Sequence, residues 1–110
     1  MRLRFRQRAT TEHIYAHVKD IKNKTKDRLY KEARRLGELD TGYHIIIHND
    51  GSAEYDRDIN AVAQYDFENN ETSIYVLCDA KDIKHISDAQ KVILEELRRL
   101  YKLEIKYVEV

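Results

Sequence analysis

The chain has 110 residues, 42% of them hydrophobic and 36% charged, which is enough for one domain with one core and too few for two. Its 20 basic residues balance its 20 acidic ones, so net charge gives no general attraction to nucleic acid or to a membrane. No apolar run is long enough to span a bilayer, and the one cysteine, Cys78, excludes an internal disulfide and suits a reducing compartment. We therefore expect a cytoplasmic protein.

The N-terminal segment, residues 2–8, alternates arginines with apolar residues, a pattern typical of an edge strand with one charged face. Its four arginines form a local basic patch on a neutral chain. The patch is either a charged edge that prevents edge-to-edge aggregation or a docking strip for an acidic or polar partner. A second short strand is predicted for residues 14–18, with His17 near its end.

The middle of the chain predicts a helix followed by a β-hairpin. Thr25 can cap a helix that runs to about Arg35. Residues 45–47 are three consecutive isoleucines, and this lack of alternation indicates a strand buried on both faces and central in its sheet. Asp50-Gly51 then gives the turn, because glycine adopts positive φ without steric cost, and a return strand follows.

The C-terminal part predicts a buried strand over residues 73–78, a helix, and a last strand over residues 105–110. Ser87 and Gln90 form a capping box that opens the helix. The order β-β-α-β-β-β-α-β favours an α/β fold, one domain over residues 1–110 with a mixed sheet and helices packed on it. The expected core consists of Ile45, Ile46, Ile47, Ile74, Val76, Val92, Ile93, Leu97 and Leu100.

Residues in a recognisable order and spacing run through nearly the whole chain. They are Phe5, Gln7, Arg8, Ile14, His17, Gly37, Leu39, Asp40, Gly42, Tyr43, His44, Ile46, Ile47, Asp50, Gly51, Arg57, Asp58, Ala61, Val62, Ser73 and Ile74. In this arrangement the sequence resembles the zinc-dependent N-acetylmuramoyl-L-alanine amidases and peptidoglycan-recognition proteins, and within them the lysozymes of the T-odd phages. The resemblance implies their mixed-sheet fold, here in a C-terminally truncated form.

The chemistry of that family uses a zinc ion with three protein ligands and an open position for water. By the resemblance, His17 stands at the first histidine ligand and Tyr43 at an active-site tyrosine. The second histidine corresponds to Tyr107-Val108-Glu109, and the third ligand would follow Val110. We therefore expect no catalytic residue, no bound metal and no cofactor, with His17, Tyr43 and Tyr65 as a vestigial cleft, although a longer native chain could restore the missing ligands.

The leading hypothesis is an inactive amidase-fold phage protein that binds and inhibits a macromolecular partner. The resemblance implies RNA polymerase as one such partner, and a host defence complex such as a CRISPR effector is another. The expected partner-binding residues are Arg2, Leu3, Arg4, Phe5 and Arg6. Two alternatives are a muropeptide-binding module lined by Tyr43, Tyr65 and Tyr75, and a residual zinc amidase.

Overall fold

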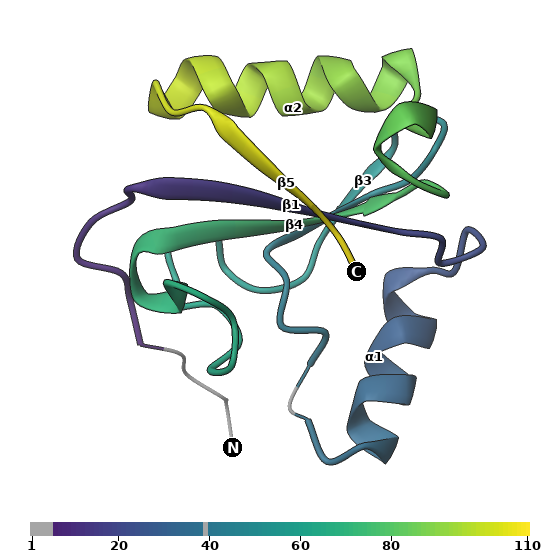
Figure 1. Ribbon diagram of the computed structural model, residues 1–110. Helices are drawn as coiled ribbons and strands as arrows, with labels where there is room; N and C mark the ends of the chain where they lie inside the picture. Colours follow the sequence, from purple (N-terminus) through teal and green to yellow (C-terminus); the bar gives the residue numbers. More distant parts are fainter. Residues whose placement is uncertain (1–5, 39) are drawn as a thin grey trace.

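The computed structural model describes residues 6–38 and 40–110. Over these residues the chain forms a five-stranded sheet and two α-helices (Figure 1). The elements are β1 (His13–Lys19), α1 (Lys26–Arg35), β2 (Ile45–Ile47), β3 (Ala53–Tyr55), β4 (Ser73–Asp79), α2 (Asp88–Tyr101) and β5 (Ile105–Glu109), with short 3₁₀ turns at Asn70–Thr72 and Ile83–His85. None of the described helices is long and apolar enough to cross a membrane.

The strands lie in the order β3-β2-β4-β1-β5, and every neighbouring pair is parallel except the β2–β3 hairpin. Strand β4 is the middle one, and all seven of its residues are buried. The predicted burial of the three isoleucines is confirmed, since all of β2 is buried between β3 and β4. Strands covered on both faces need apolar side chains in both directions, which explains these unbroken apolar runs.

The two faces of the sheet carry different side chains. On β1, Ile14, Ala16 and Val18 join the main core, which partly buried residues of α2 help to cover. The alternate residues Tyr15 and His17 point to the opposite face, because successive side chains of a strand alternate between faces. Helix α2 lies over the first face and α1 lies on the other side of the sheet (Figure 1).

Helix α2 begins with the predicted capping box of Ser87 and Gln90. Its buried residues are Gln90 and Leu94, whereas Val92 is 58% exposed and Leu100 73% exposed. The placement of Val92 and Leu100 in the core was therefore wrong. Gln90 lies on the buried face because its side-chain amide donates to two strand carbonyls, and apolar periodicity does not detect such a polar contact.

The first segment of the chain differs from its prediction. Residues Arg2, Leu3, Arg4 and Phe5 lie outside the described residues. From residue 6 onward, the expected edge strand is reduced to one isolated antiparallel bridge between Gln7 and Ala61. The guanidinium group of Arg8 donates a hydrogen bond over 2.8 Å to the carbonyl oxygen of Ala61. The bridge itself consists of two backbone hydrogen bonds, from the Arg8 N–H to the Asn60 carbonyl and from the Val62 N–H to the Arg6 carbonyl.

Candidate functional site

His17 lies on β1, on the sheet face opposite α2, and its ring is half-buried. Its Nδ1 nitrogen lies 2.7 Å from the hydroxyl oxygen of Tyr43, which comes from the segment that leads into β2. The two rings meet edge to face, with centroids 5.4 Å apart. The structure therefore brings together the two residues that the resemblance assigned to a catalytic centre.

Three more aromatic residues complete this site. The rings of Phe67 and Tyr75 lie 5.1 Å and 5.0 Å from the His17 ring, both edge to face. Tyr15 stacks on Tyr75 at 4.9 Å. We call Tyr15, His17, Tyr43, Phe67 and Tyr75 the aromatic cluster. Edge-to-face packing places positive ring edges on negative ring faces, which orients the imidazole of His17.

The electrostatics of the His17–Tyr43 pair favour two neutral partners. Burial lowers the pKa of His17, because the charged imidazolium loses hydration. Burial also raises the pKa of Tyr43, and the nearby carboxylate of Asp66 raises it further. At neutral pH the tyrosine hydroxyl is therefore protonated and the imidazole uncharged. Either the Tyr43 hydroxyl donates to Nδ1 or an Nδ1–H donates to the hydroxyl oxygen. In both cases the tyrosine oxygen and the imidazole Nε2 each keep a further hydrogen-bonding position.

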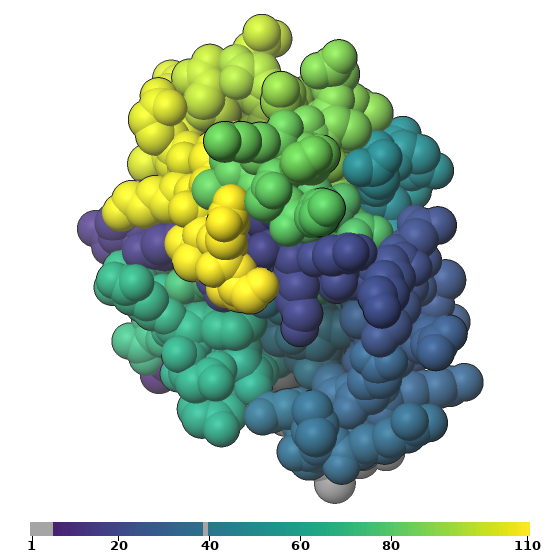
Figure 2. Space-filling model, turned by 45° about the vertical axis from the view of Figure 1, so that its right-hand side comes forward, coloured from purple at the N-terminus to yellow at the C-terminus, as the bar shows by residue number. Residues whose placement is uncertain are grey.

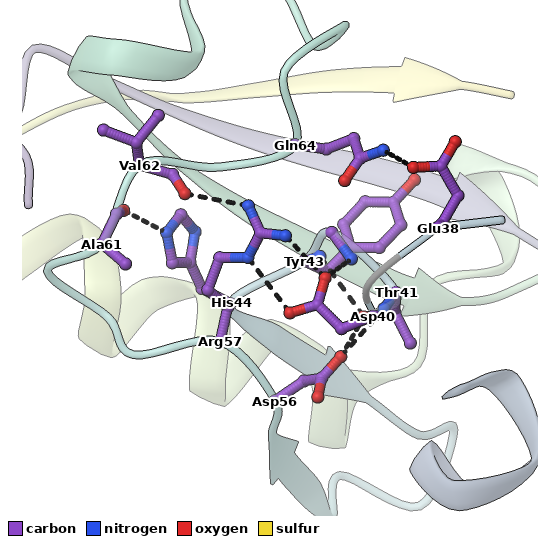
Figure 3. Close-up of polar contacts among 11 residues, drawn as sticks. Glu38, Asp40, Thr41, Tyr43, His44, Asp56, Arg57, Ala61, Val62 and Gln64 are labelled. Atoms are coloured by element: carbon purple, nitrogen blue, oxygen red, sulfur yellow. Dashed lines mark hydrogen bonds and ion pairs between the residues drawn. The ribbon is translucent and has the colours of Figure 1, made fainter. Parts of the chain in front are cut away.

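A buried ion pair holds the segment that carries Tyr43 (Figure 3). The guanidinium of Arg57 donates over 2.6 Å to Asp40 and over 2.9 Å to the carbonyl of Val62. Asp40 also accepts from the backbone N–H of Gly42 over 2.8 Å. The side chains of Arg57 and Asp40 are only 5% and 8% exposed, so this pairing compensates two charges removed from water.

His44 fixes the same segment on the β4 side. The backbone N–H of Tyr75 donates over 3.0 Å to His44 Nδ1, which leaves the proton on Nε2, 2.8 Å from the carbonyl oxygen of Ala61. Burial lowers the pKa of His44 to about 4, and the positive charges of Arg8 and Arg57 act in the same direction. The imidazole is therefore a neutral structural link between β4 and the loop at Ala61.

A groove of about 200 Å³ opens beside Tyr43, between α1 and the sheet. Its sheet side includes Ile21, Tyr43 and Leu77, and its α1 side includes Leu29 and Leu36. A second pocket of about 400 Å³ lies on the other side of the segment that precedes Tyr43, and the lining there includes Arg6, Glu38, Gln64 and Tyr65. Figure 2 shows α1, in blue, and the residues around 60–72, in green, as two flanks below β1.

The described residues do not fit a three-ligand zinc site. Over residues 6–38 and 40–110, no group of three His, Cys, Asp or Glu side chains could hold a metal ion. The ring neighbours of His17 are aromatic, and its register partner on β5 is Val108. A single imidazole binds a divalent ion weakly, so we assign no reaction step to a metal.

The remaining predicted site residues are placed as follows. Tyr65 is 76% exposed and lines the second pocket instead of the aromatic cluster. Arg6, the one described residue of the N-terminal strip, is exposed and forms an ion pair with Glu71. The strip and its partners, RNA polymerase or a defence complex, stay a prediction. Sequence reasoning missed Phe67, which stands in an irregular segment where no periodicity marks a buried face.

No protein-family model matches the chain. The chain is 37% identical over 78 residues to the endolysin of Enterobacteria phage T3, which covers 68% of this chain and 52% of that protein. It is 34% identical to the endolysin of Klebsiella phage KP32, over 96% of this chain and 75% of that protein. The chain belongs to the phage endolysin family. It spans about half the length of its relatives in phages T3 and T7.

Solved structures confirm the fold of this endolysin-family chain. The peptidoglycan-recognition protein PGRP-Hd from Alvinella pompejana superposes with a TM-score of 0.76 at 16% identity, over 96% of this chain and 77% of that one. The N-acetylmuramoyl-L-alanine amidase LysC from Clostridium intestinale gives 0.73 at 20% identity, over 89% of this chain and 70% of that one. The predicted α/β fold and the resemblance to amidases and peptidoglycan-recognition proteins are both confirmed.

The same comparisons contradict the prediction that the chain is not an enzyme. Its sequence relatives are named endolysins, and structures that share its fold are named amidases. The prediction of inactivity rested on ligand positions at and beyond residues 107–110, near the end of the chain. The similarity to the endolysin of phage KP32 instead extends over 96% of the sequence. The expectation of an inactive protein was therefore wrong.

Proposed function

We propose that this chain acts on peptidoglycan as an amidase-type endolysin, and that the groove beside Tyr43 binds the muropeptide. The observation that carries the proposal is that the hydroxyl of Tyr43, a residue that lines this groove, lies 2.7 Å from Nδ1 of His17. The names of the sequence relatives and of the structures that share the fold support the choice of peptidoglycan as the substrate.

The chemistry of the groove suits the peptide end of a muropeptide. Ile21, Leu29 and Leu77 offer an apolar surface for a small side chain such as the methyl group of alanine. The neutral hydroxyl of Tyr43 can donate a hydrogen bond to an amide carbonyl, because its raised pKa keeps it protonated. A volume of about 200 Å³ is below that of a complete ligand pocket, so the groove holds only part of the ligand.

His17 is not among the residues that line the groove, and its part is to position the hydroxyl of Tyr43, which does line it. A neutral imidazole can exchange a hydrogen bond with Tyr43 through Nδ1 and so fix the direction of the tyrosine hydroxyl. The aromatic rings of Phe67 and Tyr75 fix the imidazole plane, so little orientational freedom remains to be lost on binding. We therefore assign the ligand contact to Tyr43 and the positioning of its hydroxyl to His17.

Titration calorimetry with muramyl dipeptide tests the proposal, because this probe contains the amide between lactate and L-alanine. Tyr43→Phe removes only one hydroxyl and should weaken binding about five- to tenfold, the effect of one lost hydrogen bond of about 1–1.5 kcal/mol. Tyr55→Phe is the matched control, since Tyr55 is 64% exposed on β3 and lies outside this groove.

Hydrolysis is measured separately, as the release of new alanine amino groups from purified peptidoglycan. Activity that depends on Tyr43 and His17, but not on Tyr55, supports the proposal. Binding and hydrolysis that are identical in Tyr43→Phe, His17→Ala and the Tyr55→Phe control would exclude this groove as the site. Circular dichroism of each variant confirms that the fold is retained.

A further inference from the structure

The two helices are attached to the sheet in different ways. In α2, the buried side chain of Gln90 donates to the carbonyls of Ile47 and Asp79, over 3.1 Å and 2.8 Å. Leu94 is buried one turn later, at 1% exposure. Polar bonds to two strands and a buried leucine therefore fix α2. Helix α1, which forms one wall of the groove, has no fully buried residue.

The groove-facing side of α1 consists of Leu29, Glu32, Ala33 and Leu36, spaced by three and four residues. Leu29 packs against Ile46 and Leu77 of the sheet and against Ile21, which follows β1. Two turns later, Leu36 at the C-terminal cap of the helix is 83% exposed. Figure 1 shows the corresponding arrangement, because α1 begins beside the sheet and runs away from it.

One carboxylate holds the attached end of α1. Glu54 on β3 accepts a hydrogen bond over 3.0 Å from the backbone N–H of Lys26, the first residue of the helix. Its charge also complements the positive N-terminal end of the helix dipole. His48 fixes Glu54 from the other side, with Nε2 2.6 Å from the carboxylate. The polar anchor at the start of the helix therefore consists of this charged contact and a longer one, 3.5 Å, from Lys26 Nζ to the carbonyl oxygen of Tyr55 on β3.

Both connections of α1 contain residues with positive φ. Lys22 and Asn23 have φ of 54° and 57°, and Gly37 has φ of 86° with nothing within 4 Å of the position a Cβ would occupy. Left-handed residues change the chain direction sharply, and such loop positions at element ends absorb hinge motions. The position of a Cβ at Gly37 is open, and the next residue, Glu38, accepts a hydrogen bond from the side chain of Gln64, which marks the fixed end of this connection.

We propose that α1 is a lid, which detaches from the sheet without global unfolding and docks when a ligand fills the groove. On docking, Leu36 covers the ligand and exchanges its exposure to water for an apolar contact. The described contacts that oppose opening are the packing of Leu29, the Glu54 carboxylate and the contact from Lys26 to the Tyr55 carbonyl, all near the start of the helix. The identity of the ligand rests on the proposed function, whereas the detachment of α1 does not.

Hydrogen exchange detects the lid directly. A detached helix of 10 residues is shorter than the ~12–15 residues that an isolated helix needs, so it loses its hydrogen bonds while open. In the free protein, the amides of α1 should therefore exchange at least tenfold faster than those of α2. Saturating muramyl dipeptide should slow α1 and leave α2 unchanged. Protection of α1 equal to that of α2 in the free protein would overturn the proposal.

Two pairs of variants distinguish a helix α1 that closes on a ligand from one that is only mobile. Glu54→Gln should speed exchange in α1 about two- to tenfold, as expected for a lost charge at a helix N-terminus, whereas Glu96→Gln on the exposed face of α2 should not. Leu36→Ala should weaken muramyl dipeptide binding at unchanged melting temperature. Leu100→Ala is the control, since Leu100 is similarly exposed but lies outside the groove.

Failure of the lid proposal can be distinguished from failure of the proposed muropeptide binding. If Leu36→Ala binds muramyl dipeptide as well as Leu100→Ala does, α1 does not close on the ligand and the lid is overturned. If the probe does not bind to the wild type at all, the proposed function fails. The detachment of α1 is then decided by exchange in the free protein alone, where fast exchange of α1 relative to α2 supports it.

Discussion

The Nδ1 nitrogen of His17 on β1 lies 2.7 Å from the hydroxyl of Tyr43, which precedes β2. The strand β1 and the strand β2 that Tyr43 leads into are not neighbours, because β4 lies between them. Their side chains therefore meet across β4, where Tyr75 forms the floor beneath the imidazole. The strand order thus brings His17 and Tyr43 together, and the protonation and hydrogen bonding of each side chain can be tested separately.

The first prediction concerns the protonation of His17. Burial lowers its pKa below the ordinary value of 6.5, so the neutral imidazole persists to lower pH than in an unfolded chain. We expect muropeptide binding to be constant near pH 7 and to fall as the pH drops through this lowered pKa. Nitrogen-detected NMR of the imidazole ring measures the titration. A pKa above 6.5 would contradict the assignment of a neutral orienting group.

The second prediction concerns His44 and the pH dependence of stability. Its pKa is about 4 in the folded protein and 6.5 in the unfolded chain, so the unfolded state binds more protons between these values. Stability is therefore complete above pH 6.5 and falls as the pH drops towards 4. A shift of this size corresponds to about 3 kcal/mol.

Urea unfolding between pH 7 and pH 4 measures this effect. The variant His44→Gln can still donate to the carbonyl of Ala61 and should flatten the pH profile, at some cost in stability at pH 7. An identical slope in His44→Gln and wild type would show that other groups produce the acid sensitivity.

The third prediction tests the buried face of α2. Leu94 is 1% exposed in the main core, so Leu94→Ala should lower the free energy of unfolding by about 2–5 kcal/mol. Leu100 is 73% exposed, and Leu100→Ala should change it by less than about 0.5 kcal/mol. Denaturant unfolding measures both. Equal losses in the two variants would mean that the helix is rotated from the orientation described.

The fourth prediction concerns the buried ion pair below Tyr43. Asp40→Ala leaves the guanidinium of Arg57 without its carboxylate and should cost about 3–5 kcal/mol. The double variant Asp40→Ala/Arg57→Met removes both charges and should be less destabilised than the single variant. A double-mutant cycle from urea unfolding measures the coupling. Additive losses would show that the two side chains act independently.

Much of the secondary structure was predictable because its signals are local. Thr25 caps α1 by accepting from the N–H of Arg28, three residues later, and Ser87 and Gln90 cap each other over the same spacing. The hairpin turn at Gly51 has positive φ, as the Asp-Gly pair indicates. Each of these interactions joins residues that are close in the chain, so the sequence alone determines it.

The tertiary structure decided which residues meet and which face each helix buries. His17 and Tyr43 are 26 residues apart, and Asn69 reaches Tyr15 over 54 residues. Such contacts depend on strand order and register, which local patterns leave open. The buried position of Gln90 likewise follows from two strand carbonyls that only the assembled sheet brings together. The sequence alone thus determined the family and the elements with local signals, whereas the site exists only because parallel strands align side chains from distant segments.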